Sequence, residues 1–229
     1  MNSNDLKIDT VSHHGWENYY RNQKGAKSWN EVPDEFLLDH LNDILPAQGG
    51  SIIDVASGDG RNTVPFLGRG CNVVSTDLSP SALVSFRDRC ARDGLESPVL
   101  LVGDFMSLEF TERQFDVVVC FNGISHFPSI HQVLEKMCKL LTRGGKAVFN
   151  AFTANDVAFG LGEKLQENTF FYRDTLSNFT SEGEIKEMLP HLDIKVTHSE
   201  TRKWEEDDHG CYRTGKHTHE ACFFIIQRI

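Results

Sequence analysis

The chain has 229 residues, of which 39% are hydrophobic and 24% charged, and its formal net charge is −10. This length suits one domain with a large core. The acidic balance argues against general nucleic-acid binding, which needs a basic footprint. We see no apolar run long enough to cross a membrane and no N-terminal signal region, so we expect a cytoplasmic protein. The six cysteines lack close pairing, which favours reduced core thiols.

Helical and strand patterns alternate along the chain. Each predicted helix is indicated by apolar residues at helical spacing or by a capping signal. The predicted helices cover 34–45, 62–68, a segment starting at Ser79-Pro80, 129–141 and 180–189. The predicted strands are short apolar or alternating runs at 51–55, 71–77, 100–105, 114–122, 145–149, 192–196 and 217–227. We expect Gly144 to stop the fourth helix, and the acidic segment between the last two strands to be a loop.

Strands separated by helices imply a parallel sheet with right-handed crossovers, closed here by an antiparallel C-terminal hairpin. In open sheets of this kind a ligand lies beyond the carboxyl ends of the parallel strands. We therefore expect residues 54–60, 77, 104–105, 121–126 and 150–152 to surround one crevice.

A small-residue loop follows the first strand, within the run from Ser51 to Thr63. Such a strand–loop–helix unit lets backbone approach a ligand closely. Asp77 ends the next strand, where a carboxylate grips a ribose hydroxyl pair. Thr63 replaces the third glycine of a dinucleotide fingerprint, and the carboxylates Asp54 and Asp59 suit an ammonium group better than a pyrophosphate. The unit predicts a nucleoside-bearing ligand.

At these residues the chain resembles the class I methyltransferases, which bind S-adenosylmethionine. Their first motif reads acid-x-Gly-x-Gly-x-Gly, and Asp54-Val-Ala-Ser-Gly-Asp-Gly60 matches it except at Ala56. The runs 100–105, 114–122 and 140–149 resemble later motifs, so the likeness covers roughly 51–152. It implies a Rossmann-like α/β sheet with helices on both faces, S-adenosylmethionine as cofactor and methyl transfer to a small-molecule acceptor. A narrower likeness is to the small tellurite-resistance and thiopurine types.

The resemblance implies a set of cofactor contacts around the crevice: Trp29, Asp54, Ala56, Gly58, Gly60, Arg61, Asn62, Asp77, Leu78, Asp104, Phe105 and Phe121. Several have a structural alternative. Asp77 would cap a turn, Asp104 would be an ordinary loop acid and Phe105 would be core. Asn62 reads more readily as a helix cap, and Arg61 either as a partner of the ligand carboxylate or as a solvated side chain.

The reaction side is expected after the fourth and fifth strands. His126 is a candidate general base, with Asn122 and Asn150 as candidates to orient the acceptor; the alternative for His126 is a structural histidine that bonds a loop carbonyl. Residues 153–180 form the expected acceptor-side insertion of this single domain, with the aromatic run 170–173 as acceptor wall or as core.

Residues 1–32 form an expected lid, whose aromatic rings (Trp16, Tyr19, Tyr20 and Trp29) would cover the cofactor. The alternative is an N-terminal helix packed permanently by the same rings.

His209, His217 and His219, with Asp207 and Asp208, raise a zinc hypothesis. We favour a polar hairpin rim and predict no metal. Two other functions stay open: a non-methyl reaction of the same cofactor, such as aminopropyl transfer or cyclisation that releases methylthioadenosine, and a non-catalytic cofactor-binding subunit. The sequence names neither the acceptor, its attacking atom nor an oligomeric state.

Overall fold

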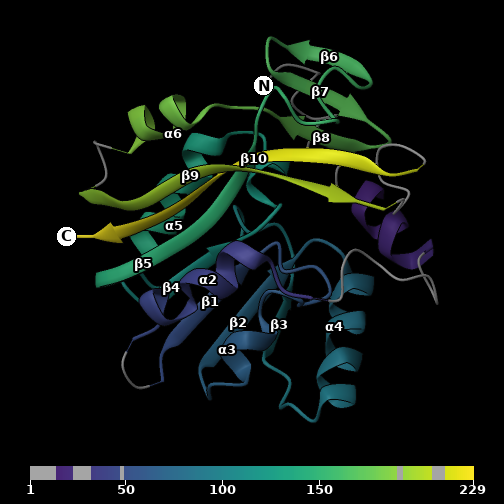
Figure 1. Cartoon of the computed structure of the whole chain (residues 1–229). Coiled ribbons are helices and arrows are strands. Elements are labelled where there is room, and N and C mark those ends of the chain that lie inside the picture. The colour runs from purple at the N-terminus through teal and green to yellow at the C-terminus, as the bar shows by residue number, and fades with distance from the viewer. Residues whose placement is uncertain (1–13, 23–31, 47–48, 190–192, 208–214) are drawn as a thin grey trace.

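The computed structural model describes residues 14–22, 32–46, 49–189, 193–207 and 215–229 (Figure 1). Within these ranges a seven-stranded sheet has the strand order β3-β2-β1-β4-β5-β10-β9. The pairs from β3 to β5 are parallel, whereas β10 is antiparallel to both β5 and β9. The predicted Rossmann-like sheet with a C-terminal antiparallel hairpin is therefore confirmed.

The strands of this sheet are β1 (Ser51–Val55), β2 (Asn72–Asp77), β3 (Val99–Val102), β4 (Phe115–Cys120), β5 (Leu141–Phe152), β9 (Ile194–Glu206) and β10 (His217–Arg228). The helices are α2 (Glu35–Ile44), α3 (Val64–Leu67), α4 (Pro80–Asp93), the 3-10 turn η1 (Ile124–His126), α5 (Ile130–Leu140) and α6 (Glu182–Met188). Residues 14–22 form a further helix, hereafter the N-terminal helix.

Successive side chains of the central strands divide between two cores. On β4, Val118 joins the core of α5 and α6, whereas Val117 and Val119 join the core that holds α2. This division follows from strand geometry, in which neighbouring side chains point to opposite faces. Because apolar layers cover both faces of the central strands, a polar ligand has room only at the strand ends.

Three predicted elements differ from the structure. The helix expected over 62–68 is only α3, because the chain turns before it and Thr63 serves as its N-cap. The helix expected to stop at Gly144 already ends at Leu140, and Gly144 (φ +80°) lies instead in the irregular start of β5. The segment expected as an acidic loop is largely β9, which pairs with β10 as far as Glu206.

The insertion after β5 forms a small sheet that was not predicted. Its strands are β6 (Glu163–Gln166), β7 (Thr169–Tyr172) and β8 (Thr175–Asn178). Phe159, Phe170 and Phe179 pack edge to face beneath it, with centroid separations of 5.1, 5.2 and 5.9 Å. The small sheet stands above β10 in Figure 1 and forms one side of the strand-end region.

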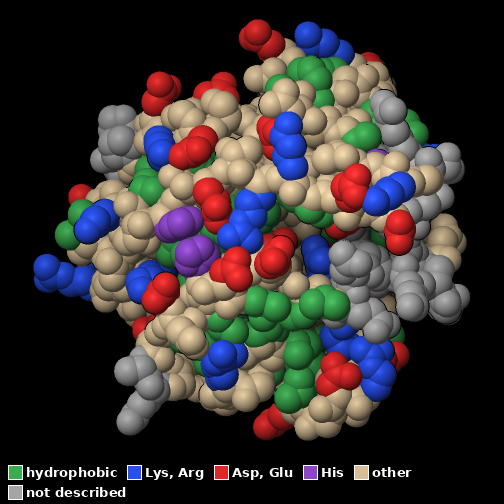
Figure 2. Space-filling view, in the orientation of Figure 1, with side chains coloured by type: hydrophobic (Ala, Val, Ile, Leu, Met, Phe, Trp, Pro, Cys, Tyr) green, Lys and Arg blue, Asp and Glu red, His purple; other side chains and the backbone are tan. Residues whose placement is uncertain are grey.

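Charges of both signs mix on the face over β9 and β10 (Figure 2). Lys203 pairs with Glu220 at 3.1 Å and Lys216 with Glu205 at 2.5 Å, each across the two strands. Such exposed pairs add little stability individually. In the described part of the chain, no helix is both long and apolar enough to span a membrane.

Candidate active site

A cavity of about 990 Å³ opens at the carboxyl ends of the parallel strands. It lies at the upper end of the range for small-molecule sites, about 300–1,000 Å³. Most of the predicted site residues line it: Ala56, Gly58, Arg61, Asn62, Asp77, Leu78, Asp104, Phe105, Phe121, Asn122 and His126. Asp54, Gly60 and Asn150 do not line it, and Trp29 lies outside the described residues.

The glycine loop has the left-handed backbone that the motif requires, including at its one non-glycine position. The φ angles are +55° at Ala56, +56° at Gly58 and +79° at Gly60. Alanine therefore adopts a conformation that costs about 1–2 kcal/mol relative to the right-handed region. A Cβ on Gly60 would lie 2.1 Å from the Phe86 ring, so this glycine allows α4 to pack against the loop.

Asp77 holds the loop in place from the end of β2. Its Oδ2 accepts a hydrogen bond from the Gly58 amide and its Oδ1 from the Ser79 amide, each at 2.8 Å. Burial raises the pKa of Asp77 to about 6, although these amide hydrogen bonds oppose the shift. A carboxylate has about four acceptor positions, so both oxygens can still accept a ribose hydroxyl.

The other two loop carboxylates are committed to protein partners. The Asp54 carboxylate accepts from the Thr63 hydroxyl, and burial raises its pKa to about 7. Asp59 forms a buried pair with Arg89 at 2.7 Å, and the Arg89 Nε also donates to the Asp59 carbonyl. Asp54 therefore supports the loop from behind, and its direct contact with the cofactor stays a prediction.

Two hydroxyls missed at the sequence level fit a polar ligand. Ser57 Oγ and Thr76 Oγ1 are buried and have no hydrogen-bond partner among the described residues. Both residues line the cavity. A buried polar atom without a partner is costly, so a bound nucleoside would satisfy atoms that the protein leaves unsatisfied. Ser57 occupies an unspecified position of the glycine-loop motif and Thr76 lies within β2, so the sequence did not single out either hydroxyl.

The loop after β3 is fixed by a lysine that the sequence did not indicate. Lys136 Nζ donates to the carbonyls of Phe105, Met106 and Leu108 at 2.6, 3.1 and 2.6 Å. Asp104 caps the same loop through the Met106 amide and the Ser107 hydroxyl. Phe105 is 2% exposed and packs in the core with α5. A ligand at this loop can therefore contact mainly the loop backbone, along the edge that faces the cavity.

Arg61 and Asn62 face α2. Asn62 Oδ1 accepts from the Asp34 amide at 2.8 Å, and Arg61 reaches the Val32 carbonyl at 3.5 Å. Asn62 thus ties the glycine loop to the start of α2, and does not cap its own helix.

Asn122 and Asn150 act as a reciprocal pair at the ends of β4 and β5. The Asn122 amide donates to Asn150 Oδ1 at 2.6 Å, and Asn150 Nδ2 donates to Asn122 Oδ1 at 2.7 Å. Asn122 has a φ of +55°. Asn150 is 1% exposed and does not line the cavity, so the structure shows it holding Asn122 in position.

His126 is partly buried and lines the end of the cavity that Phe127, Pro128 and Ser129 also line. Its Nδ1 lies 2.6 Å from the Leu176 carbonyl of β8. A carbonyl only accepts, so Nδ1 carries the proton and the neutral ring keeps its lone pair on Nε2. Burial lowers the pKa of His126 to about 4, which is too low for an efficient general base near neutral pH.

The N-terminal helix borders the cavity through Trp16 and Tyr20. Glu17 accepts hydrogen bonds from Ser79 and Ser81 at the start of α4, including both hydroxyls at 2.7 and 2.8 Å. A Cβ on Gly58 would lie 2.4 Å from the Tyr20 hydroxyl. Trp16 packs edge-on against His126 at 4.7 Å. Three side chains therefore connect this helix to the cofactor loop, to α4 and to the reaction side.

The aromatic run 170–173 does not line the cavity. Phe170 is 6% exposed and packs with Phe159 and Phe179. The core alternative is thus correct for Phe170, and the insertion contributes to the site through the Leu176 carbonyl that orients His126.

Comparison with known proteins agrees with this geometry. A family model described as a methyltransferase domain matches residues 52–145. A ubiquinone biosynthesis O-methyltransferase of Rickettsia felis is 24% identical over 208 residues, which cover 83% of this chain and 79% of the relative. An uncharacterized protein of Mycobacterium bovis is 30% identical over 147 residues, which cover 62% of this chain and 52% of the relative.

The chain contains a methyltransferase domain, and it is similar to the class I S-adenosylmethionine-dependent methyltransferases. It uses S-adenosylmethionine to methylate a small-molecule acceptor. A solved 1,6-didemethyltoxoflavin-N1-methyltransferase of Burkholderia thailandensis has a TM-score of 0.68 to this methyltransferase at 18% identity, covering 96% of this chain and 88% of the other. At that identity the likeness shows the fold alone.

Proposed function

We propose that this methyltransferase acts on a flat, largely apolar small molecule, bound between the N-terminal helix and the loop after β4. The supporting observation is the composition of that end of the cavity. Aromatic rings and one proline form its walls, namely Trp16, Phe121, Phe127 and Pro128. A few polar groups are placed among them, from Asn122, His126, Ser129 and Gln132. This mixture is typical of sites that orient a ring by a small number of hydrogen bonds.

The opposite end of the cavity is proposed to hold the cofactor. Asp77 would accept the ribose hydroxyls, the Ser57 and Thr76 hydroxyls would meet polar atoms of the ligand, and the loop over residues 104–107 would border the adenine. S-adenosylmethionine, when bound there, supplies a methyl group made electrophilic by its sulfonium. The residues of the chain then have to align the acceptor and exclude water.

We propose that His126 positions the acceptor and does not serve as its base. A neutral imidazole with its lone pair on Nε2 can accept a hydrogen bond, but a pKa of about 4 gives little driving force for proton abstraction. An acceptor that is already ionised, or that attacks through an atom carrying no proton, fits this environment. Asn122, held by Asn150, supplies a second fixed polar contact.

Two similar proteins support this substrate class. One is a ubiquinone biosynthesis O-methyltransferase, and the other is a 1,6-didemethyltoxoflavin-N1-methyltransferase. In this proposal two segments of the single domain keep their predicted roles. Residues 1–32 would cover the bound ligands, and the insertion over 153–180 would support the acceptor end. A cytoplasmic location stays a prediction.

The test is incubation of the protein with S-adenosylmethionine and matched aromatic and aliphatic acceptors that carry hydroxyl, thiol or amine groups. Mass spectrometry should find S-adenosylhomocysteine together with methylated aromatic products. Methylation of the aliphatic set alone would overturn the proposed substrate class. Release of methylthioadenosine would indicate a non-methyl reaction, and cofactor binding without any product would indicate a non-catalytic subunit.

A matched variant pair locates the acceptor. Trp16→Ala should raise the KM for the aromatic acceptor, while Trp16→Phe should restore most of the affinity because it keeps a ring. Glu187→Gln, an exposed change on α6, serves as the control. An unchanged KM in Trp16→Ala would exclude this wall from the acceptor site.

A further inference from the structure

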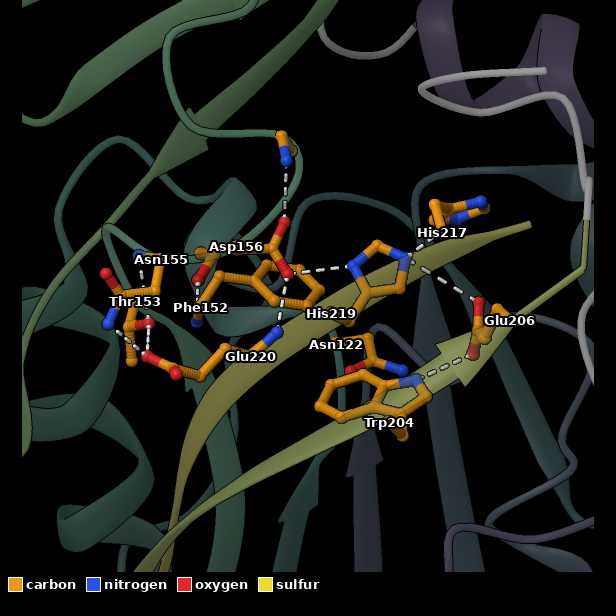
Figure 3. A network of polar contacts seen from close by, with 12 residues as sticks. Asn122, Phe152, Thr153, Asn155, Asp156, Trp204, Glu206, His217, His219 and Glu220 are labelled. Carbon is orange, nitrogen blue, oxygen red and sulfur yellow. Dashed lines mark hydrogen bonds and ion pairs between the residues drawn. The ribbon is translucent and has the colours of Figure 1, made fainter. Parts of the chain in front are cut away.

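Two histidines and a glutamate converge at the end of the β9–β10 hairpin (Figure 3). His217 Nε2 lies 3.1 Å from His219 Nε2, and His219 Nε2 lies 3.7 Å from Glu206 Oε2. Each of the three residues offers one atom that can coordinate a metal, and these three atoms all lie within 4.8 Å of one another. Their exposed fractions are only 8%, 2% and 7% for His217, His219 and Glu206. These three polar side chains of the hairpin are therefore buried and not exposed to solvent.

The pairing of the strands produces this convergence. His217 and His219 are two residues apart on β10 and so point to the same face. Glu206 is directly opposite His217 in the antiparallel register, and Trp204 is opposite His219. The Trp204 Nε1 donates to Glu206 Oε1 at 2.9 Å and orients the carboxylate toward the histidines.

Each imidazole has its Nδ1 committed to an acceptor. His219 Nδ1 lies 2.8 Å from Asp156 Oδ2, which also accepts from the Glu220 amide. His217 Nδ1 lies 2.9 Å from the Gly215 carbonyl. Carboxylate and carbonyl oxygens accept, so in the neutral rings both protons reside on Nδ1. The two Nε2 atoms and a carboxylate oxygen of Glu206 then face a common point, an arrangement that a cation among them would stabilise.

We propose that His217, His219 and Glu206 form a binding site for a divalent transition metal of the zinc type. Tetrahedral zinc with bonds of about 2.0–2.1 Å separates its ligand atoms by roughly 3.3 Å, and the 3.1 and 3.7 Å distances bracket this value. Two imidazoles and one carboxylate are an established zinc donor set with one position left for water or another ligand. Nitrogen donors favour such a metal over magnesium or calcium.

Asp156 completes the site from outside. A carboxylate that accepts from the second nitrogen of a metal-binding histidine fixes its tautomer and raises its basicity. Asp156 belongs to the segment after β5, and its side chain is fully buried. The metal would therefore join the β9–β10 hairpin to the start of the acceptor-side insertion. Phe152 separates it from the active site, with ring centroids 5.7 Å from His219 and 6.2 Å from His126.

The test is metal titration of the full-length protein after removal of metal by a chelator. Competition with a chromophoric chelator should show one zinc bound per chain at this site, and cobalt should give the visible absorption of a four-coordinate nitrogen–oxygen site. Zinc should also raise the Tm, because it binds the folded state. None of these readouts depends on methyl transfer, so they remain valid if the proposed acceptor class is wrong.

Variants assign the metal to these residues. Asp156→Asn should weaken zinc by about 10–100-fold, as expected for an orienting partner. His217→Ala and Glu206→Gln remove a ligand and should weaken it by at least the same factor. The paired control is His40→Ala with His198→Ala, which removes the other described histidine cluster, formed with Glu200. It should leave the zinc affinity unchanged.

Glu206→Gln keeps the side-chain volume, so it remains informative if His217→Ala fails to fold. Zinc bound with wild-type affinity by a folded Glu206→Gln variant, or lost in the His40/His198 control alone, would overturn the assignment. Absence of zinc and cobalt binding by the wild-type protein would also overturn it.

Discussion

The Cβ of Ala56 occupies space that a Cβ on Gly123 would need, since the two atoms would lie 2.7 Å apart. Ala56 stands where the methyltransferase motif usually has glycine, and it keeps the left-handed backbone of that position. Gly123, in the loop after β4, leaves room for the added methyl group. The departure from the motif is thus matched by a glycine 67 positions later in the chain.

This relationship predicts a double-mutant cycle. Gly123→Ala should destabilise the fold by about 1–3 kcal/mol, because it overpacks the contact with Ala56 and with Cys120 Sγ at 3.0 Å. Ala56→Gly in the same chain should recover part of that loss. Urea unfolding of the four proteins measures the coupling. Additive effects would show that the two positions do not share this space.

Asp77 should control cofactor affinity. Asp77→Ala removes a charged acceptor of ribose hydroxyls, whose bonds are worth about 1.5–3 kcal/mol each, so calorimetry should find much weaker S-adenosylmethionine binding. Asp88→Ala, an exposed change on α4, is the control. Thermal unfolding of the ligand-free variant must show a folded protein, and unchanged affinity would contradict the ribose assignment.

The same residue should make binding pH-dependent. The ionised carboxylate accepts the ribose hydroxyls, and its pKa is raised by burial to about 6. Affinity should therefore be constant above this pH and fall as pH decreases through it. The free energy of unfolding has the opposite pH dependence. Because the pKa of Asp77 is raised in the folded state, its ionised form destabilises the fold above about pH 6. This destabilisation disappears as pH falls toward the ordinary Asp pKa of 3.8. Calorimetry and denaturation across pH 4.5–8 separate the two trends.

His126→Asn should distinguish positioning from general-base catalysis. If His126 positions the acceptor, the acceptor KM should rise, and kcat should fall by less than the roughly 10²-fold expected for a lost base. Cofactor affinity should stay near that of the wild type. A kcat loss of 10²–10⁴ with unchanged KM would instead establish the base that the sequence suggested.

The N-terminal helix should close over bound cofactor, as an entry lid must. Hydrogen exchange in residues 14–22 should slow when S-adenosylmethionine or S-adenosylhomocysteine is added. Glu17→Gln should reduce this protection, because it weakens the contact with Ser79 and Ser81. Equal protection with and without ligand would support the alternative of a permanently packed helix.

Acid should release the same contact. Desolvation alone would raise the Glu17 pKa, but hydrogen bonds from Ser79, Ser81 and Arg21 outweigh it and lower the pKa to about 2. Docking of the helix is therefore fully supported above the ordinary value of 4.5 and is lost as pH falls from there toward 2. Limited proteolysis by an acid-active protease checks this, and a cleavage pattern independent of pH in that window would contradict it.

The sequence by itself determined the sheet, most of its helices and the location of the site. Strand and helix periodicities are local properties, and Ser79-Pro80 and Ser181 mark their helix starts through caps that the structure confirms. The carboxyl ends of parallel strands meet at one edge for topological reasons. Predicted residues from four separate loops consequently line one cavity, among them Gly58, Asp77 and His126.

Only the tertiary structure decided which side chains face a ligand and which support the site. Asp54 and Asp59 look alike in sequence, yet Thr63 and Arg89 reach them across the fold. Lys136 fixes a loop about 30 residues earlier in the chain. The sequence predicts only a polar hairpin rim at His217 and His219. The strand register shows that Glu206 is opposite His217 and therefore close to both histidines. Burial and hydrogen-bond partners depend on contacts between segments distant in the chain, and no local pattern of residues encodes those contacts.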